Sequence, residues 1–201
     1  MNKASLARLA AALALAIAAV GAVLFLTPWG RSLWSKDGET TIGQALIGGP
    51  FHLIDQTGKP RTDADFHGQY LLVYFGYTNC PDVCPTTLQT ITNAMDKLGA
   101  DAAKVTPIFI TVDPDRDTTD VLKAYASNFH PRLVALTGSA AEIAAAAKAY
   151  RIYYAKVGEG ADYSMDHSSI VYLMGPDGKY LGHFGMDATA DDIAAGVRGE
   201  F

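Results

Sequence analysis

The longest apolar run of the chain lies near its N-terminus. Leu9 to Leu26 is 18 residues without a charged or polar side chain, which is about the length that a helix needs to cross a bilayer. Lys3 and Arg8 precede the run, and the positive-inside rule keeps the end that carries them in the cytoplasm. The pattern predicts a membrane anchor over residues 1–26 with a short cytoplasmic end, and it places the chain after Thr27 outside.

A cleaved secretory signal is the competing interpretation of this run. Small residues around 20–22 could serve a signal peptidase, but "VLFL" prolongs the apolar run beyond them and favours an uncleaved anchor. Both interpretations export the rest of the chain. No long Arg- and Ser-rich leader precedes the run, so we expect a single-pass protein of a bacterial inner membrane, with its globular part in the periplasm.

Residues 27–44 are polar, contain glycine and show no sustained period, which predicts a tether ahead of a globular domain over 45–201. In that domain, "YLLVYFGY" (Tyr70 to Tyr77) and "VTPIFITV" (105–112) are continuous apolar runs. Such runs are typical of strands buried on both faces of a sheet. Two shorter strands are expected around the turn at 56–59.

Helical spacing follows the first buried strand and recurs later in the chain. Apolar residues from Leu88 to Leu98 recur every three or four positions, and Gly99 is a natural C-cap. A second helix is predicted around 121–129, then a short strand in "RLVAL". Ser139 with Glu142 forms a capping box ahead of a third helix that ends near 150.

The last part of the domain predicts a hairpin and a closing helix. "SSIVYLMGPDGKYLGHFG" should turn at 176–178, and residues 189–198 should form a short helix. Strands that alternate with helices, followed by a late hairpin and a helix, predict an α/β fold on a mixed central sheet. That order of elements is thioredoxin-like.

Charge narrows the function classes without choosing one. The formal net charge of −5 is spread over the exported part of the chain, and no basic patch is present to hold phosphate backbones. We therefore expect no nucleic-acid partner.

The two cysteines of the chain, Cys80 and Cys84, carry its most informative chemistry. They follow the first buried strand, and each precedes a proline that disfavours the α conformation of the cysteine. Pro85 suits the first position of the following helix, so the pair should lie on a loop and a first helical turn. A helix N-terminus lowers thiol pKa values, which favours the thiolate that binds metal or attacks disulfides.

Several uses of this pair are open. A structural disulfide would close a very small loop and remove little chain entropy. Structural zinc needs four Cys or His ligands, whereas soft Cu(I) suits two thiolates with a third ligand such as imidazole. A redox couple is the remaining use.

His167 is the candidate for that third ligand. It stands just before the first strand of the late hairpin, in "MDHSS". In thioredoxin-like folds the loop before that strand lies against the cysteine motif and usually presents a cis-proline, which "YSMDHSSI" lacks. Asp166 could orient the ring, as carboxylates do for many metal-bound histidines, or it could equally point to solvent. The other histidines, His52, His67, His130 and His183, are interpreted as structural or surface residues.

With these features the chain resembles the Sco/SenC family. The similarity covers about 48–185 and rests on "YFGYTNCPDVCP", "VDPDRDT", "LVALTG", "YRIYY" and "DHSSIVYLMGPDGKY" in that order. The resemblance implies a membrane-anchored copper chaperone for the CuA centre of cytochrome c oxidase. It places the copper ligands on Cys80, Cys84 and His167, for Cu(I) and also Cu(II). It implies the copper-bearing oxidase subunit as a partner, with other copper chaperones or thiol reductases as further candidates.

An exported thiol–disulfide oxidoreductase that reduces a cuproprotein's cysteines is the alternative hypothesis. It would use Cys80 and Cys84 as a redox-active disulfide. Such enzymes more usually carry Cys-x-x-Cys, and a peroxiredoxin would carry Thr where this chain has Tyr77, three residues before Cys80. A redox or copper sensor with the same site is a third reading. Only the reduced dithiol binds copper, so metal and redox roles can be linked.

The "DPDRD" segment that follows the second buried strand has no single interpretation. Asp113, Asp115 and Asp117 could form turns and cap the next helix. Alternatively, Asp113 and Asp117, like Asp166, contact the acceptor protein or form an outer shell around the metal.

Overall fold

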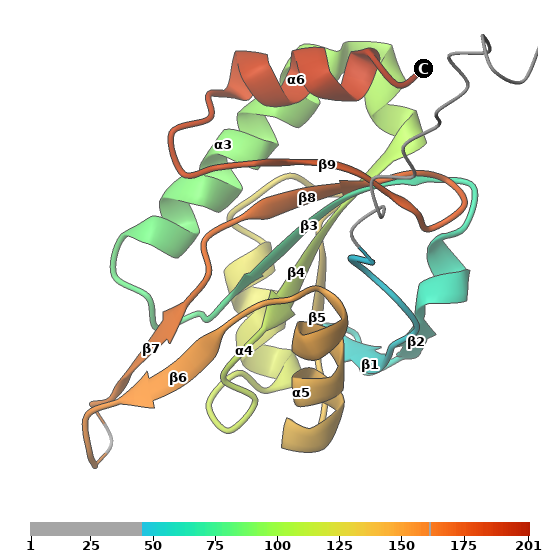
Figure 1. The fold of residues 1–201 in the computed structure, drawn as a ribbon. Helices are drawn as coiled ribbons and strands as arrows, with labels where there is room; N and C mark the ends of the chain where they lie inside the picture. Colours follow the sequence, from blue (N-terminus) through green and yellow to red (C-terminus); the bar gives the residue numbers. More distant parts are fainter. Residues whose placement is uncertain (1–45, 161) are drawn as a thin grey trace, which may run out of the picture. The chain divides into compact units, whose positions relative to one another are not determined.

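The structure, a computed structural model, describes residues 46–160 and 162–201 (Figure 1). The predicted anchor over 1–26 and the tether over 27–44 lie outside the described residues. Within the described ranges, no helix is both long enough and apolar enough to cross a membrane.

Seven strands form one mixed sheet in the order β2-β1-β5-β4-β3-β8-β9. The strands are β1 (His52–Asp55), β2 (Pro60–Thr62), β3 (Tyr70–Gly76), β4 (Val105–Thr111), β5 (Val134–Thr137), β8 (Val171–Met174) and β9 (Tyr180–Phe184). β3, β4 and β5 run parallel, while β1 and β8 pair antiparallel with the two sides of that trio. β3 lies between β4 and β8, the first strand of the late hairpin.

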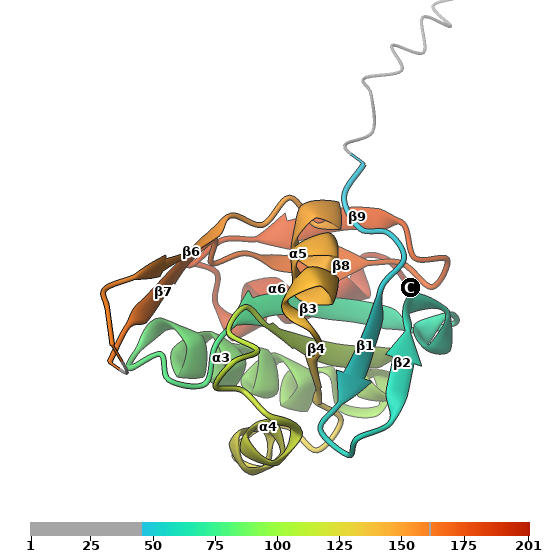
Figure 2. The ribbon, with the colours of Figure 1, turned by 90° about the horizontal axis from the view of Figure 1, so that it is seen from below.

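Helices cover both faces of this sheet. The helices are α3 (Val83–Leu98), α4 (Thr119–Ala126), α5 (Ala140–Ala149) and α6 (Ala190–Arg198), with short 3-10 turns η1 (Asp63–Phe66) and η2 (Gly99–Lys104). α3 and α4 lie on one face with α6 packed along α3, and α5 lies on the opposite face (Figures 1 and 2). Parallel strands joined by helices on one face follow the right-handed crossover rule.

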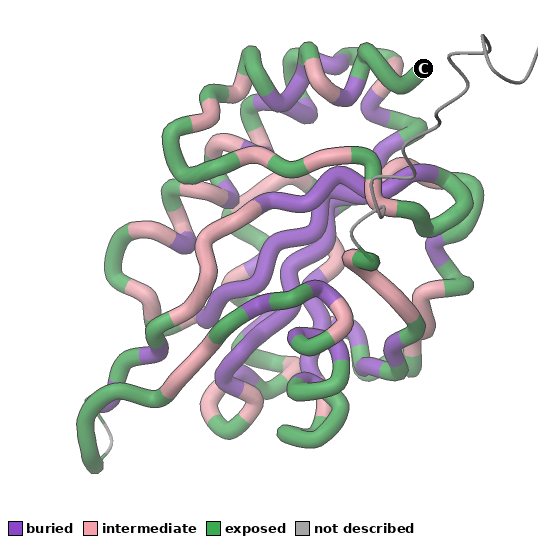
Figure 3. Tube along the Cα trace, viewed as in Figure 1, coloured by how far each residue is buried: buried purple, intermediate pink, exposed green. Residues whose placement is uncertain are grey.

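The core is centred on β3 and β4, which appear as the buried stretch in the middle of Figure 3. All seven residues of β4 are buried, and so are six of the seven residues of β3. Burial on both faces explains why these strands read as continuous apolar runs rather than as alternating patterns. The prediction for both strands is confirmed.

The predicted signals at the helix ends are confirmed, except that α3 begins earlier than predicted. Gly99 follows α3 with a φ of +59°, and the Ser139–Glu142 capping box precedes α5. α3 begins at Val83, so Pro85 occupies the third helical position instead of the first. Proline is tolerated there because the first backbone N–H groups of a helix have no partner within the helix.

A separate two-stranded sheet was not predicted. β6 (Tyr154–Val157) and β7 (Ser164–His167) pair antiparallel with each other, with Tyr154 opposite His167. Within the described residues this pair does not join the seven-stranded sheet, and it projects from the body as a hairpin (Figure 1). Its two strands are short, partly polar and only partly buried, so they carry neither a clear alternation nor a continuous apolar run.

Candidate metal centre

The two cysteines lie where β3 passes into α3. Cys80 is half-buried in the connecting loop, and Cys84 is fully buried in the first turn of α3 with none of its surface exposed. Both are free thiols. The backbone N–H of Cys84 donates to the Cys80 sulfur at 3.4 Å, so the helix N-terminus faces the first cysteine.

The two thiols differ in acidity. Burial acts to raise the pKa of Cys80, but backbone N–H groups of Cys84, Asp82 and Val83 outweigh it, and the pKa falls below its ordinary value. For Cys84 burial dominates and raises the pKa to about 12. The predicted lowering by the helix N-terminus is therefore found at Cys80 only, because Cys84 lies beneath the turn, away from water.

His167 faces Cys84 across 83 positions of the chain. Its Nε2 lies 3.4 Å from the Cys84 sulfur, while its Nδ1 lies 3.1 Å from the Ser168 carbonyl oxygen. A carbonyl oxygen only accepts, so Nδ1 carries the proton and the Nε2 lone pair of the neutral ring points at the sulfur. Burial lowers the pKa of His167, which favours this neutral form. It is the form that binds a metal.

Aromatic rings and a glycine shape the space around the imidazole. Tyr74 and Tyr77 meet the His167 ring edge-on, with centroids 6.1 Å and 5.9 Å away. A Cβ added at Gly76 would lie 3.0 Å from the Cys84 sulfur and 2.8 Å from the Phe109 ring. Glycine at this position therefore lets the buried sulfur approach β3 closely.

Asp166 does not orient the imidazole. Successive residues of a strand point to opposite faces, and Asp166 is exposed while Met165 is buried and His167 half-buried. The Ser168 carbonyl holds Nδ1 instead. Of the two alternatives for Asp166, its exposure fits the one that points to solvent, and Ser168, whose carbonyl holds Nδ1, was not singled out although it adjoins His167.

Asp113 and Asp117 are buried, with their carboxylates occupied inside the domain. Asp113 accepts hydrogen bonds from the Tyr163 hydroxyl and Arg116, and Asp117 accepts from Thr78 and Thr111. Direct contact of either carboxylate with an acceptor protein does not fit this burial. Sequence reasoning missed Tyr163, Arg116 and Thr78, and an arginine placed within an acidic loop was the one available signal.

The donor set suits a soft metal, although it is not closed. In the ranges 46–160 and 162–201, no three Cys, His, Asp or Glu side chains are close enough together to hold a metal ion as they stand. The Cys84 sulfur and the His167 imidazole are in contact, and the Cys80 sulfur accepts a hydrogen bond from the backbone N–H of Cys84. Two sulfurs and one imidazole match the preferences of copper.

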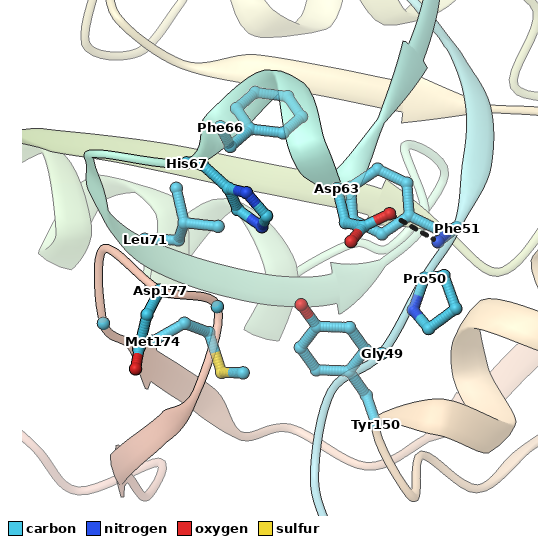
Figure 4. A pocket seen from close by; sticks show the side chains of 12 residues that line it. Gly49, Pro50, Phe51, Asp63, Phe66, His67, Leu71, Tyr150, Met174 and Asp177 are labelled. Carbon is cyan, nitrogen blue, oxygen red and sulfur yellow. Dashed lines mark hydrogen bonds between the residues drawn. The ribbon is translucent and has the colours of Figure 1, made fainter.

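The remaining histidines lie elsewhere, as expected. His67 lines a cavity of about 120 Å³ with Asp63, Tyr150 and Met174 (Figure 4). That cavity adjoins Leu71 at the start of β3, whereas the cysteines follow the end of this seven-residue strand, about 20 Å away at the usual rise per residue. It is not part of the candidate metal centre.

Together the fold and the site define a thioredoxin-like domain with a dithiol and a facing imidazole. The family description SCO1/SenC matches residues 39–201 of this chain. The chain belongs to the SCO1/SenC family.

Three comparisons illustrate this membership. The human mitochondrial SCO1 homolog is 43% identical over 166 residues, which cover 81% of this chain and 55% of that protein, so the chain spans little more than half of that relative. The structure of Bradyrhizobium japonicum ScoI with copper bound is 46% identical, has a TM-score of 0.73, and is covered to 99% by 77% of this chain. The third is BsSco, a member of the Sco family of cytochrome c oxidase assembly proteins in which a disulfide switch has been identified. Its structure is 32% identical with a TM-score of 0.65, and the match covers 79% of this chain and 95% of BsSco.

Proposed function

We propose that this protein binds copper through Cys80, Cys84 and His167 and delivers it to the copper-bearing subunit of cytochrome c oxidase. The observation that carries the proposal is the 3.4 Å approach of His167 Nε2 to the Cys84 sulfur, with Nδ1 turned to a carbonyl. Relatives with copper bound and relatives in oxidase assembly support it.

The residues divide the work of holding the metal. The more acidic, more accessible Cys80 meets the incoming Cu(I) first, and Cys84 follows as its proton is displaced. His167 supplies a nitrogen that is already unprotonated. Cu(I) can be held by the two thiolates, whereas Cu(II) prefers more ligands, including nitrogen.

A second candidate function is thiol–disulfide exchange with the cysteines of a cuproprotein. The unequal thiols favour it, because an accessible cysteine of lowered pKa attacks and a buried one of raised pKa resolves. The disulfide switch described for BsSco points the same way. Oxidation to a Cys80–Cys84 disulfide would also prevent copper binding, since neither sulfur would then be a thiolate.

The proposed location is the bacterial inner membrane. Residues 1–26 would anchor the chain, 27–44 would tether it, and the domain over 45–201 would face the periplasm. The full-length protein should then resist carbonate extraction, and protease added from the periplasmic side should digest the domain. A soluble mature form beginning near Val23 would replace the anchor by a signal peptide.

One experiment separates the two candidate functions. Copper-loaded protein is mixed with a reduced, copper-free CuA domain, and in parallel the reduced, metal-free protein is mixed with an oxidised one; metal and thiol states of both partners are followed. Copper that moves while the donor dithiol stays reduced supports delivery. Reduction of the oxidised recipient without metal supports thiol–disulfide exchange. If neither occurs, both proposals fail.

A further inference from the structure

The proposed ligands come from two sheets that are not hydrogen-bonded to each other. The cysteines follow β3 of the seven-stranded sheet, and His167 ends β7 of the separate β6–β7 pair. Backbone ladders therefore do not set the distance between imidazole and sulfurs. The loop between β4 and α4, which contains Asp113, Arg116 and Asp117, contacts both halves.

On the cysteine side, Asp117 anchors the loop that carries Cys80. Its carboxylate accepts from the Thr78 backbone N–H at 3.0 Å and from the Thr78 hydroxyl at 2.5 Å. It also accepts from the Thr111 hydroxyl at the end of β4 at 2.5 Å. None of Asp117 is exposed. Thr78, two residues before Cys80, is thus tied to the central sheet.

On the histidine side, Asp113 and Arg116 anchor the hairpin through Tyr163. The Tyr163 hydroxyl donates to Asp113 at 2.6 Å, and an Arg116 Nη1–H donates to the Tyr163 carbonyl at 2.9 Å. The guanidinium carbon lies 3.6 Å from the Tyr163 ring centroid, and 5.9 Å from that of Tyr77 in the cysteine loop. Tyr163 directly precedes β7, the strand that ends at His167.

We propose that the 113–117 loop is a clasp that sets the separation between His167 and the cysteines. Asp117 holds the cysteine arm, and Asp113 with Arg116 holds the histidine arm. The inference rests on the proposed copper site for its consequence, but the clasp itself is a property of the metal-free protein. Because Cu(II) needs the imidazole more than Cu(I) does, the histidine arm should discriminate between the two oxidation states.

The histidine arm is tested by Tyr163→Phe, which removes only the hydroxyl that donates a hydrogen bond to Asp113. In the metal-free protein, amide exchange in β7 should quicken about fivefold, as expected for one lost hydrogen bond. Cu(II) affinity should fall by about tenfold to a hundredfold, the usual effect of losing an outer-shell contact, with a shifted thiolate charge-transfer band. Cu(I) affinity should change much less.

The cysteine arm is tested by Thr78→Val, which keeps the side-chain shape and removes the hydroxyl bond to Asp117. Amide exchange should quicken around Cys80 and stay unchanged in β7. Affinities for Cu(I) and Cu(II) should fall by a similar factor, because both states use the thiolates. Asp115→Asn is the matched control: Asp115 is exposed in the same loop, and its change should leave every readout as in the unaltered protein.

Two results would overturn the clasp. One is unchanged β7 exchange in Tyr163→Phe; the other is an equal effect of Asp115→Asn. If Tyr163→Phe failed to fold, Arg116→Lys would test the same arm, since lysine keeps the charge without the planar fork. Absence of copper binding by the unaltered protein would refute the proposed function and leave the exchange test of the clasp intact.

Discussion

The seven-stranded sheet and the β6–β7 hairpin hold their halves of the site in different ways. β3, which leads to the cysteines, is paired along both edges and buried under helices. In the hairpin, Lys156 is exposed and Val157 is 45% exposed, and the two strands pair with each other rather than with the main sheet. Buried backbone ladders hold the strand that leads to the thiols, with Asp117 bracing the loop after it, whereas side-chain contacts join the imidazole's hairpin to the main sheet.

The difference suggests that the cysteine side of the site is rigid and that the hairpin with His167 can adjust its position. The strand that leads to the sulfurs, β3, is expected to open last, since core strands have the highest local stability. His167 sits on a part that can shift at a cost of a few hydrogen bonds. A site built in this way keeps its dithiol fixed and can add or release the third ligand, which suits a metal that must be passed on.

The strongest test of this difference is to remove the proposed ligands from the cysteine side and from the histidine side separately. Cys80→Ser or Cys84→Ser should each abolish Cu(I) binding, and His167→Ala should weaken it without abolishing it. Cu(II) should lose its thiolate charge-transfer absorption in all three variants. Metal analysis after gel filtration should give one copper per reduced unaltered chain and none per oxidised chain. Equal loss of Cu(I) in His167→Ala would show that the imidazole is not the adjustable ligand.

Stability should separate the same two regions. Phe75→Ala, in the buried β3 strand, should lower the free energy of unfolding by about 3–5 kcal/mol, as other core phenylalanines do. Val157→Ala, in the exposed β6 strand, should change it by less than about 0.5 kcal/mol. Urea denaturation of the 45–201 domain measures both. Comparable losses would mean that the hairpin is as tightly integrated as the core.

A pH test concerns the outer part of the main sheet, where the buried carboxylate of Asp55 pairs with Arg61. Burial acts to raise the pKa of Asp55, but hydrogen bonds from Thr57 and Arg61 lower it from 3.8 to about 2. A depressed carboxyl pKa stabilises the fold above the unfolded pKa, and this contribution is lost as pH falls from about 4 towards 2. It amounts to about 2 kcal/mol.

Asp55→Asn should therefore lower stability at pH 7 and flatten its decline between about pH 4 and pH 2. Unfolding curves of both proteins across that window measure the difference. Parallel curves for variant and unaltered protein would show that the Asp55–Arg61 pair, at 2.9 Å, contributes nothing to folding.

The smallest expected effect comes from one buried hydroxyl beside the site. The Tyr74 and Tyr125 hydroxyls are both buried, and that of Tyr74 lies beside the side chains of Cys84, Thr87 and Ser169. Burial and the neighbouring Cys84 raise the pKa of Tyr74, which places its hydroxyl close to that sulfur. Tyr74→Phe and Tyr125→Phe should each change stability by less than about 1 kcal/mol. Only Tyr74→Phe should shift the Cu(II) charge-transfer band, and an equal shift in Tyr125→Phe would contradict this.

Much of the architecture could be predicted from residue patterns because the signals were local. Continuous apolar runs identified β3 and β4, and Gly99 and the Ser139–Glu142 pair marked helix ends, since a cap depends on residues within one turn. The cysteines were placed correctly at the junction of strand and helix. Their unequal pKa values were not predicted, because the burial of Cys84 depends on how the first turn of α3 packs against Gly76 at the end of β3.

By itself, the sequence determined most of the succession of strands and helices along the chain, the dithiol at a helix N-terminus and the candidacy of His167, because periodicity, proline geometry and thiol chemistry depend largely on neighbouring residues. Tertiary structure alone decided which ring nitrogen faces the sulfur, that Ser168 rather than Asp166 orients it, and that Asp113, Arg116 and Asp117 link the two halves. Those outcomes depend on contacts between segments tens of residues apart, where small differences in packing choose the partner of each hydrogen bond.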